Sequence, residues 1–175
     1  TYDGGPAADA LVLATGAEAR TLPGPAPAGM HTLRTAADAD RLRADLGPGR
    51  RLGVVGAGFV GAEVTSTARS MGAEVTLIDV APVPFAQVLG EEAGRVLADR
   101  YRAHGVHLRM GVGLARVLTA ADGRVSALEL ADGSVVPCHA ALIAIGAAPA
   151  SGLLGGDPAG IETDACGRTA HPGVF

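Results

Sequence analysis

Three glycines and one acid stand at spacings that suit the binding of a diphosphate-linked nucleotide. Gly56, Gly58 and Gly61 follow an apolar run over residues 52–55, and Asp79 ends the next apolar run. Glycines at this spacing permit a tight turn, a close approach of the backbone to a pyrophosphate, and tight packing of helix on strand. An acid about twenty residues later accepts hydrogen bonds from the ribose of NAD and repels an extra 2′-phosphate. The pattern therefore predicts a nicotinamide-nucleotide site with a preference for NAD.

The elements expected around these residues support that interpretation. Residues 52–55 and 75–78 are apolar runs typical of buried parallel strands. Between them, residues 59–71 are expected to form a helix, and Gly72 stands where a C-terminal cap glycine belongs. The residues expected on its buried face are Val60, Val64, Ala68 and Met71. Strand, turn, helix, strand and acid follow in the order that a dinucleotide site requires, and a glycine turn that serves only packing is the alternative.

Further elements are expected on both sides of this unit. Residues 10–16 predict a buried strand that ends in small residues, and a proline-rich connector follows. Thr35 and Asp38 have the spacing of a capping box at the start of a helix. After a proline-containing loop over 80–89, Glu91 opens another helix. The inward residues are expected to be Ala39, Leu42 and Leu46 in the first helix and Ala93, Val96, Leu97 and Tyr101 in the second.

The second half of the chain changes to short strands. Residues 106–110 predict a third parallel strand, and residues 141–146 predict another buried strand. Between them, Asp122-Gly123 and Asp132-Gly133 are hairpin turn signals. They join short strands over 114–118, 125–130 and 135–136. The sequence therefore predicts an α/β fold, a Rossmann-like parallel sheet with a three-stranded antiparallel β-meander.

Two strand ends resemble each other. Ala144-Ile145-Gly146 repeats the pattern of Ala14-Thr15-Gly16 near the start of the chain. A strand that finishes in glycine lets a planar ring or a ribose approach the backbone at the carboxyl edge of a sheet. We therefore expect two similar nucleotide-binding units. The cofactor-binding candidates from these two ends are Ala14, Thr15, Gly16, Ile145 and Gly146.

Composition excludes several classes of function. The formal net charge is −4, and the 14 cationic residues are scattered arginines, which predicts no nucleic-acid partner. No apolar run approaches the roughly twenty residues of a membrane span, so no membrane partner and a cytoplasmic location are expected. Cys138 and Cys166 stand alone and are interpreted as isolated small hydrophobic residues. The histidines show no metal-ligand spacing, so no metal site is expected.

The whole chain resembles the pyridine nucleotide-disulfide oxidoreductase superfamily of FAD/NAD(P)-binding flavoproteins, and above all its ferredoxin reductase and rubredoxin reductase branch. The segments that carry the resemblance are 9–17, 33–35, 54–63, 88–90, 167–169 and 172–175. The resemblance implies an NAD(H)-binding domain over 33–146 inserted into an FAD domain. Residues 1–32 would be the end of the first FAD-domain segment with its connector, and residues 147–175 the start of the returning segment.

The resemblance also implies cofactors, partners and residue roles. NADH would pass a hydride to FAD in the complete protein, and the flavin would pass electrons to a ferredoxin, rubredoxin or Rieske-type acceptor. Asp79 would bind the adenosine ribose, and Glu63 would approach the nicotinamide carboxamide unless it is a solvated helix position. Gly146 would lie on the nicotinamide side. The pyrophosphate would contact Gly56, Ala57, Gly58, Phe59, Val60 and Gly61.

Departures from the family pattern leave alternatives open. Ala150 stands where the family usually has Asn, and Glu18-Ala19 replaces a basic residue and Pro. The glycine motif of the FAD domain lies outside the chain, so this piece alone is expected to hold FAD poorly. The alternatives are an NAD(H)-binding sensor or regulatory module without catalysis, or a flavoprotein of the nitrite reductase or NADH oxidase type.

Overall fold

A computed structural model describes residues 8–152 and 160–175. The chain divides into two compact units. The first unit contains the residues up to Glu18 and those from Ala147 onward, and the second runs from Ala19 to Gly146. The second unit therefore begins ahead of residue 33, and the assignment of the flanks to an FAD domain stays a prediction.

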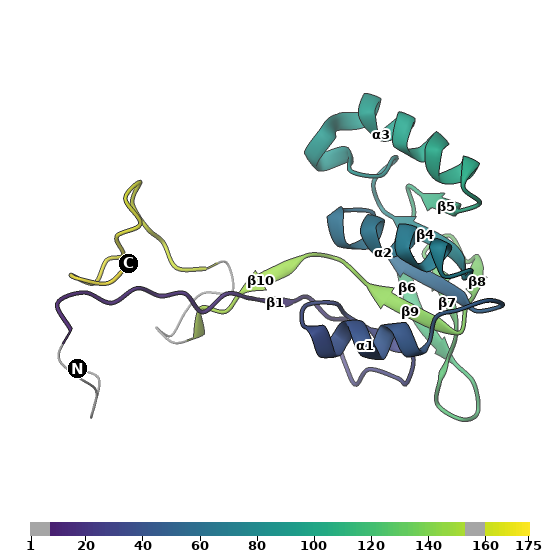
Figure 1. Cartoon of the computed structure of the whole chain (residues 1–175), viewed down its shortest axis with the longest axis horizontal. Helices are drawn as coiled ribbons and strands as arrows, with labels where there is room; N and C mark the ends of the chain where they lie inside the picture. The colour runs from purple at the N-terminus through teal and green to yellow at the C-terminus, as the bar shows by residue number, and fades with distance from the viewer. Residues whose placement is uncertain (1–7, 153–159) are drawn as a thin grey trace. The chain divides into compact units, whose positions relative to one another are not determined.

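A five-stranded parallel sheet forms the centre of the second unit (Figure 1). Its spatial order is β2-β9-β3-β4-β5, and every neighbouring pair is parallel. The strands are β2 (Met30–His31), β3 (Arg51–Val55), β4 (Glu74–Asp79), β5 (His107–Met110) and β9 (Ala140–Ile143). An antiparallel sheet of order β6-β7-β8 follows, made of β6 (Leu114–Thr119), β7 (Val125–Leu130) and β8 (Val135–Pro137). The predicted fold class is confirmed.

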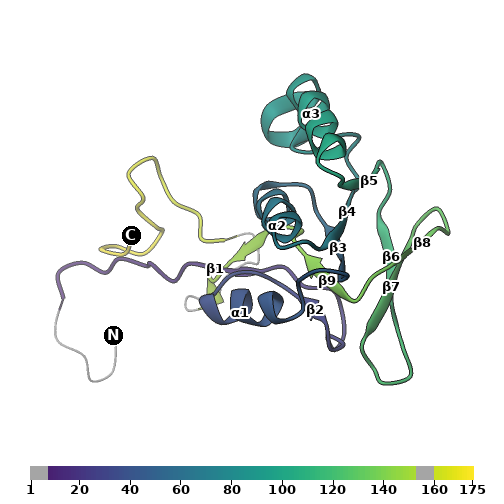
Figure 2. The same cartoon turned by 45° about the vertical axis from the view of Figure 1, so that its right-hand side comes forward.

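The second unit has three layers, with helices on one face of the parallel sheet and the meander on the other (Figure 2). Because side chains alternate along a strand, a central strand contributes side chains to the hydrophobic cores on both faces of the sheet. Val54 of β3 packs with the helices, whereas Val55 packs with the meander. Gly53 also faces the meander, and a Cβ there would overlap the Leu128 side chain. The site is thus carried on a sheet that is covered on both faces.

Helices α1 and α2 begin and end close to the predicted residues. Helix α1 (Ala36–Ala44) opens with the predicted Thr35 and Asp38 capping box. Helix α2 (Phe59–Ser70) ends before Gly72, whose φ is 85°. The predicted buried faces were wrong in part, because Ala39 and Val60 are exposed. The residues that α2 buries are Gly61, Ala62, Val64, Thr65 and Ala68. Small residues occupy that face since the helix lies close to the sheet.

Helix α3 (Ala86–Ala103) starts earlier than expected and is interrupted at Gly90, whose φ of 77° is not helical. Its main part therefore does begin at Glu91, as predicted. Ala93 and Val96 were predicted to face inward, and both are exposed. Gly94 and Ala98 are buried instead. A Cβ at Gly94 would overlap the Val83 side chain, so this contact admits only the smallest residue.

The first unit contains strand β10 (Ala147–Pro149), the first two residues of β1 (Ala17–Ala19) and an isolated bridge. Strands β1 and β10 pair in a two-stranded sheet. The buried strand predicted over 10–16 was wrong, since Leu11 is 49% and Val12 is 69% exposed. Within the described residues this segment makes a single bridge, from Leu11 to Val174. An apolar run becomes a buried strand only where neighbours cover it, and here one short segment pairs with it.

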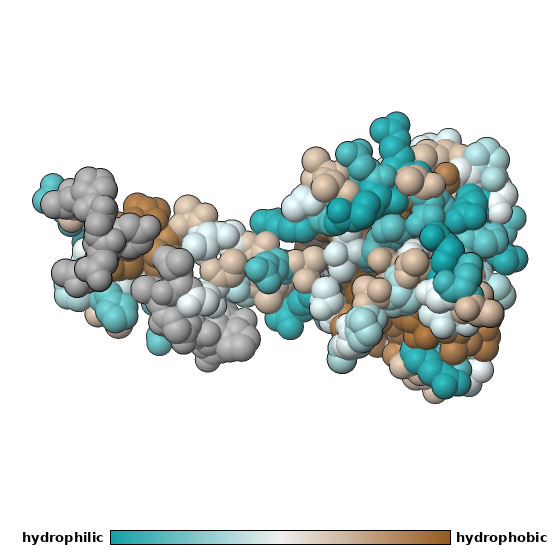
Figure 3. All heavy atoms as spheres, turned by 90° about the horizontal axis from the view of Figure 1, so that it is seen from below, coloured by the Kyte–Doolittle hydropathy of each residue, from teal (hydrophilic) through white to brown (hydrophobic). Residues whose placement is uncertain are grey.

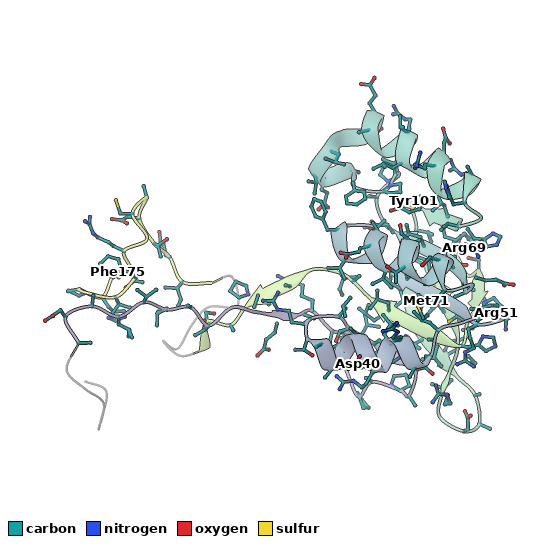
Figure 4. All side chains as sticks on the ribbon, in the orientation of Figure 1. Asp40, Arg51, Arg69, Met71, Tyr101 and Phe175 are labelled. Carbon is teal, nitrogen blue, oxygen red and sulfur yellow. The ribbon has the colours of Figure 1, made fainter. Side chains whose placement is uncertain are left out.

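In the part of the chain that the structure describes, no helix is both long and apolar enough to cross a membrane. On the face shown in Figure 3, polar side chains cover most of the second unit, and apolar residues gather along one part of its edge. Arg69 lies in the last turn of α2 and Met71 caps its C-terminal end (Figure 4). The glycine turn lies at the other end of that helix, so it faces the carboxyl edge of the sheet.

Candidate functional site

The glycine turn lies at the switch point of the parallel sheet. From β3 the chain passes through α2 to β4 on one side, whereas β9 lies on the other side of β3. Open α/β sheets bind ligands outside the carboxyl ends of the strands at such a point. Gly56 leaves β3 and donates its N–H to the Ile78 carbonyl at 2.8 Å. Ala144 leaves β9 and donates its N–H to the Val55 carbonyl at 2.7 Å.

The three glycines of the turn have different surroundings. Gly56 has a φ of 107°, and a Cβ there would overlap the Ala144 carbonyl. A Cβ at Gly61 would overlap the Gly56 carbonyl. Gly58 differs, because its φ of −83° and ψ of −163° suit any residue and no described atom lies within 4 Å of a Cβ there. The fold therefore explains the first and third glycines, whereas no contact with the described residues requires a glycine at position 58.

The start of α2 offers backbone N–H groups to the space beside Gly58. Gly58 is the N-cap residue, no side chain among the described residues caps this end, and the first turn contains no acid. Helix α1, by contrast, is capped by Thr35 and Asp38. The first N–H groups of a helix have no partner within the helix and, with the positive dipole end, favour an anion such as a phosphate. The residues and the space both fit the diphosphate of a dinucleotide.

Asp79 faces the glycine turn from the end of β4. Its Oδ2 accepts the Ala57 N–H at 2.6 Å, and its Oδ1 accepts the Ala81 N–H at 2.8 Å. A carboxylate oxygen can accept two hydrogen bonds, so each oxygen retains capacity for a ribose hydroxyl. The two backbone contacts fix the orientation of the carboxylate. Sequence spacing indicated the acid and gave no sign of these contacts.

The remaining predicted residues are distributed over both units. Ile145 and Gly146 lie at the end of β9 beside the glycine turn, and the Gly146 carbonyl accepts the Arg20 N–H at 2.9 Å. Phe59 is 65% exposed at the start of α2, and Glu63 is exposed one turn later. Ala14, Thr15 and Gly16 lie in the first unit, where the Thr15 hydroxyl donates to the Ala150 carbonyl at 2.6 Å. The structure thus gathers the turn, Asp79 and the end of β9, and describes Ala14 to Gly16 separately.

Phe85 is a site neighbour that sequence reasoning missed. Its N–H donates to the Ala57 carbonyl at 3.0 Å, and its ring makes an edge contact with Phe59 at a centroid distance of 5.2 Å. Its φ is 57°, in the left-handed region. No local signal indicates such a conformation, because it is favoured mainly by glycine, Asn and Asp.

The cysteines are not arranged for redox chemistry in the described parts of the chain. Cys138 is buried, and burial raises the pKa of its thiol to about 11. Cys166 is exposed and belongs to the first unit. No group of three or more His, Cys, Asp or Glu residues suited to a metal ion occurs among the described residues.

Comparison with known proteins shows the family. A family model described as pyridine nucleotide-disulphide oxidoreductase matches residues 5–175. The chain belongs to this family. The resemblance predicted from the sequence is confirmed, and the family consists of FAD- and NAD(P)H-dependent oxidoreductases.

Three relatives of this oxidoreductase family show the extent of the similarity. The probable ferredoxin reductase CtmF of Castellaniella defragrans is 38% identical over 95% of this chain and 42% of that relative. A covalent putidaredoxin reductase–putidaredoxin complex has a TM-score of 0.85 at 30% identity, over 95% of this chain and 42% of that chain. The water-forming NADH oxidase of Lactobacillus brevis bound to NADH has a TM-score of 0.84 at 26% identity, over 95% and 38%. The chain thus spans about two fifths of these relatives.

Proposed function

We propose that the second unit binds NADH and presents its nicotinamide to the flavin of an FAD-dependent reductase. The observation that carries the proposal is the open space at Gly58, beside an uncapped helix start and an oriented acid. The diphosphate would accept hydrogen bonds from the amides of residues 58–61, as charge-assisted bonds at a helix N-terminus. The similarity to an oxidase structure that holds NADH supports the choice of ligand.

Asp79 would select NADH over NADPH. Its carboxylate is held against the glycine turn by Ala57 and Ala81, so it is placed to accept from the adenosine ribose hydroxyls. A 2′-phosphate would bring a second negative charge against it. The segment from Val80 to Glu92 contains no Lys or Arg that would pair with that phosphate.

Electrons would leave through FAD to an iron–sulfur or rubredoxin-type acceptor. FAD, when bound in the complete protein, supplies the chemistry that accepts a hydride and releases single electrons. Ala14, Thr15 and Gly16 would lie on the flavin side, and Glu63 and Gly146 on the nicotinamide side. The proposal of a ferredoxin as acceptor is supported by CtmF and by the solved complex with putidaredoxin.

Calorimetric titration of the chain with NADH and NADPH tests this function. We expect NADH to bind at least about tenfold more tightly, and Asp79→Ala to weaken NADH by about 1.5–3 kcal/mol, the value of hydrogen bonds to a charged group. The same substitution should weaken the binding of NADPH less, since NADPH gains no favourable contact from the carboxylate. Asp40→Ala, which removes an exposed acid of α1 (Figure 4), serves as the control. Equal affinities, or a preference for NADPH, would contradict the proposal.

A further inference from the structure

Phe85 adopts a backbone conformation that large side chains rarely adopt. With φ 57° and ψ 19°, it is the one non-glycine residue of positive φ within residues 8–152 and 160–175. For a bulky residue this conformation is a true outlier. Strain of this kind persists where the surrounding contacts hold it, and it concentrates at functional sites. The contacts of Phe85 therefore indicate the role of its strained backbone.

The backbone of Phe85 joins the glycine turn to α3. Its N–H donates to the Ala57 carbonyl at 3.0 Å. Its carbonyl accepts the N–H groups of Val88 and Leu89 at 3.0 and 2.9 Å, which begin the helix. In its left-handed conformation Phe85 thus bonds the glycine turn through its N–H and the first turn of the helix through its carbonyl.

The ring of Phe85 contacts the other side of the same turn. It meets Phe59 at a centroid distance of 5.2 Å and an interplanar angle of 71°, an edge-to-face pair. Ala57 and Phe59 are the two neighbours of Gly58 in sequence. Phe85 therefore contacts the residue before and the residue after the glycine beside the open space.

The two residues that precede Phe85 are tightly packed. Val83 and Pro84, which precede it, are buried. Helix α3 lies against them so closely that a Cβ at Gly94 would overlap both the Val83 side chain and the Pro84 carbonyl. The segment that leads to Phe85 is thus held between α3 and the glycine turn, so the strained residue has little room to relax.

We propose that Phe85 is a positioning residue, which holds the glycine turn in the shape that receives the diphosphate before the dinucleotide binds. The identity of the ligand in this proposal rests on the proposed function. Ala57 has both backbone groups engaged, its N–H with Asp79 and its carbonyl with Phe85. With both groups of Ala57 fixed, the residues that follow it at the start of α2 are held in one conformation. A turn that is already ordered loses less conformational entropy on binding, which raises affinity.

Three variants of the full chain separate this role from general packing. Phe85→Gly removes the ring and also removes the backbone strain, so the two effects on stability oppose each other and the melting temperature should change little. Phe85→Tyr keeps the ring and should behave as the unaltered chain. Val96→Ala, a change to an exposed apolar residue of α3, the helix that follows Phe85, is the control.

The first measurement is ¹⁵N relaxation of the amides of residues 56–61 in the ligand-free chain. We expect lower order parameters in Phe85→Gly than in the unaltered chain, Phe85→Tyr or Val96→Ala. The second is the dissociation constant for NADH, expected to rise about 3- to 10-fold in Phe85→Gly alone. Order parameters that do not change in Phe85→Gly would overturn the proposal. If the unaltered chain fails to bind NADH, the proposed function fails, while the relaxation data still decide the role of Phe85.

Discussion

Gly58→Ala separates ligand binding from folding more sharply than other changes in the glycine turn. The backbone of Gly58 is in a region open to alanine, and in the part of the chain that the structure describes nothing lies within 4 Å of the added methyl group. Alanine at such a position gains about 0.4–1 kcal/mol through the unfolded state. It loses a similar amount as a poorer N-cap residue than glycine. The free energy of unfolding should therefore change by less than about 0.5 kcal/mol.

The same methyl group should strongly weaken the binding of NADH. It would occupy the space where a phosphate oxygen accepts N–H groups from the start of α2. Hydrogen bonds to a charged group are worth about 1.5–3 kcal/mol, so the dissociation constant should rise roughly 10- to 100-fold. Isothermal titration calorimetry measures this effect, and urea denaturation measures stability.

Gly56→Ala and Gly61→Ala are the matched comparisons. The methyl groups there would overlap the Ala144 and Gly56 carbonyls, and we expect a loss of stability of at least about 2 kcal/mol in each. A Gly58→Ala chain that binds NADH as tightly as the unaltered chain would refute the assignment of the open space. So would a Gly58→Ala chain that is as unstable as the other two, because the space would then be needed by the fold.

Two further predictions concern the buried thiol and one histidine. Because burial raises the pKa of Cys138 to about 11, iodoacetamide at about pH 8 should label Cys166 in the folded chain and label Cys138 only after denaturation, as mass spectrometry of peptides would show. Labelling of both in the folded chain would contradict this. Burial, with the positive charges of Arg51 and Arg50, lowers the pKa of His139 below 6.5, and its Nδ1 accepts the Arg51 N–H at 3.0 Å. The stabilising contribution of the neutral ring is therefore complete above about pH 6.5 and is lost as the pH falls below it. The melting temperature should fall more between about pH 7.5 and pH 5.5 in the unaltered chain than in His139→Gln, and equal falls would contradict the assignment.

Local sequence signals predicted the elements that depend on local chemistry. The Thr35 and Asp38 capping box and the span of α2 depend on hydrogen bonds and backbone angles within a few residues. The hairpins at Gly123 and Gly133 likewise need glycine at positive φ. In each case the residue type restricts the backbone directly, so one sequence suffices to predict the element.

Features that depend on tertiary neighbours were not predictable in the same way. Val96 has the expected spacing for a buried position, yet Gly94 and Ala98 face the core because α3 lies too close to Val83 for a larger residue. The segment after Ala10 has the composition of a buried strand and is exposed, because burial depends on a covering segment. The left-handed backbone of Phe85 is fixed by contacts with residues far away in the sequence.

Part of the candidate site could be predicted from the sequence. The glycine spacing and Asp79 indicated a dinucleotide, since each residue type has a reason at its position. The distinct tasks of Gly56, Gly58 and Gly61 emerge only from the structure, which fills the space beside two of them and leaves it open beside the third. The contacts of the Asp79 carboxylate with Ala57 and Ala81 are equally tertiary.

The most direct test of the central claim is a ¹H–¹⁵N correlation spectrum of the chain during titration with NADH. If the diphosphate lies against the start of α2, the largest shifts should come from the amides of Gly58, Phe59, Val60 and Gly61, with a second group at residues 79–81. An unchanged spectrum at millimolar NADH would contradict the account. Shifts confined to another region, such as the groove between α2 and α3 lined by Ser66, Arg69 and Tyr101, would contradict it as well.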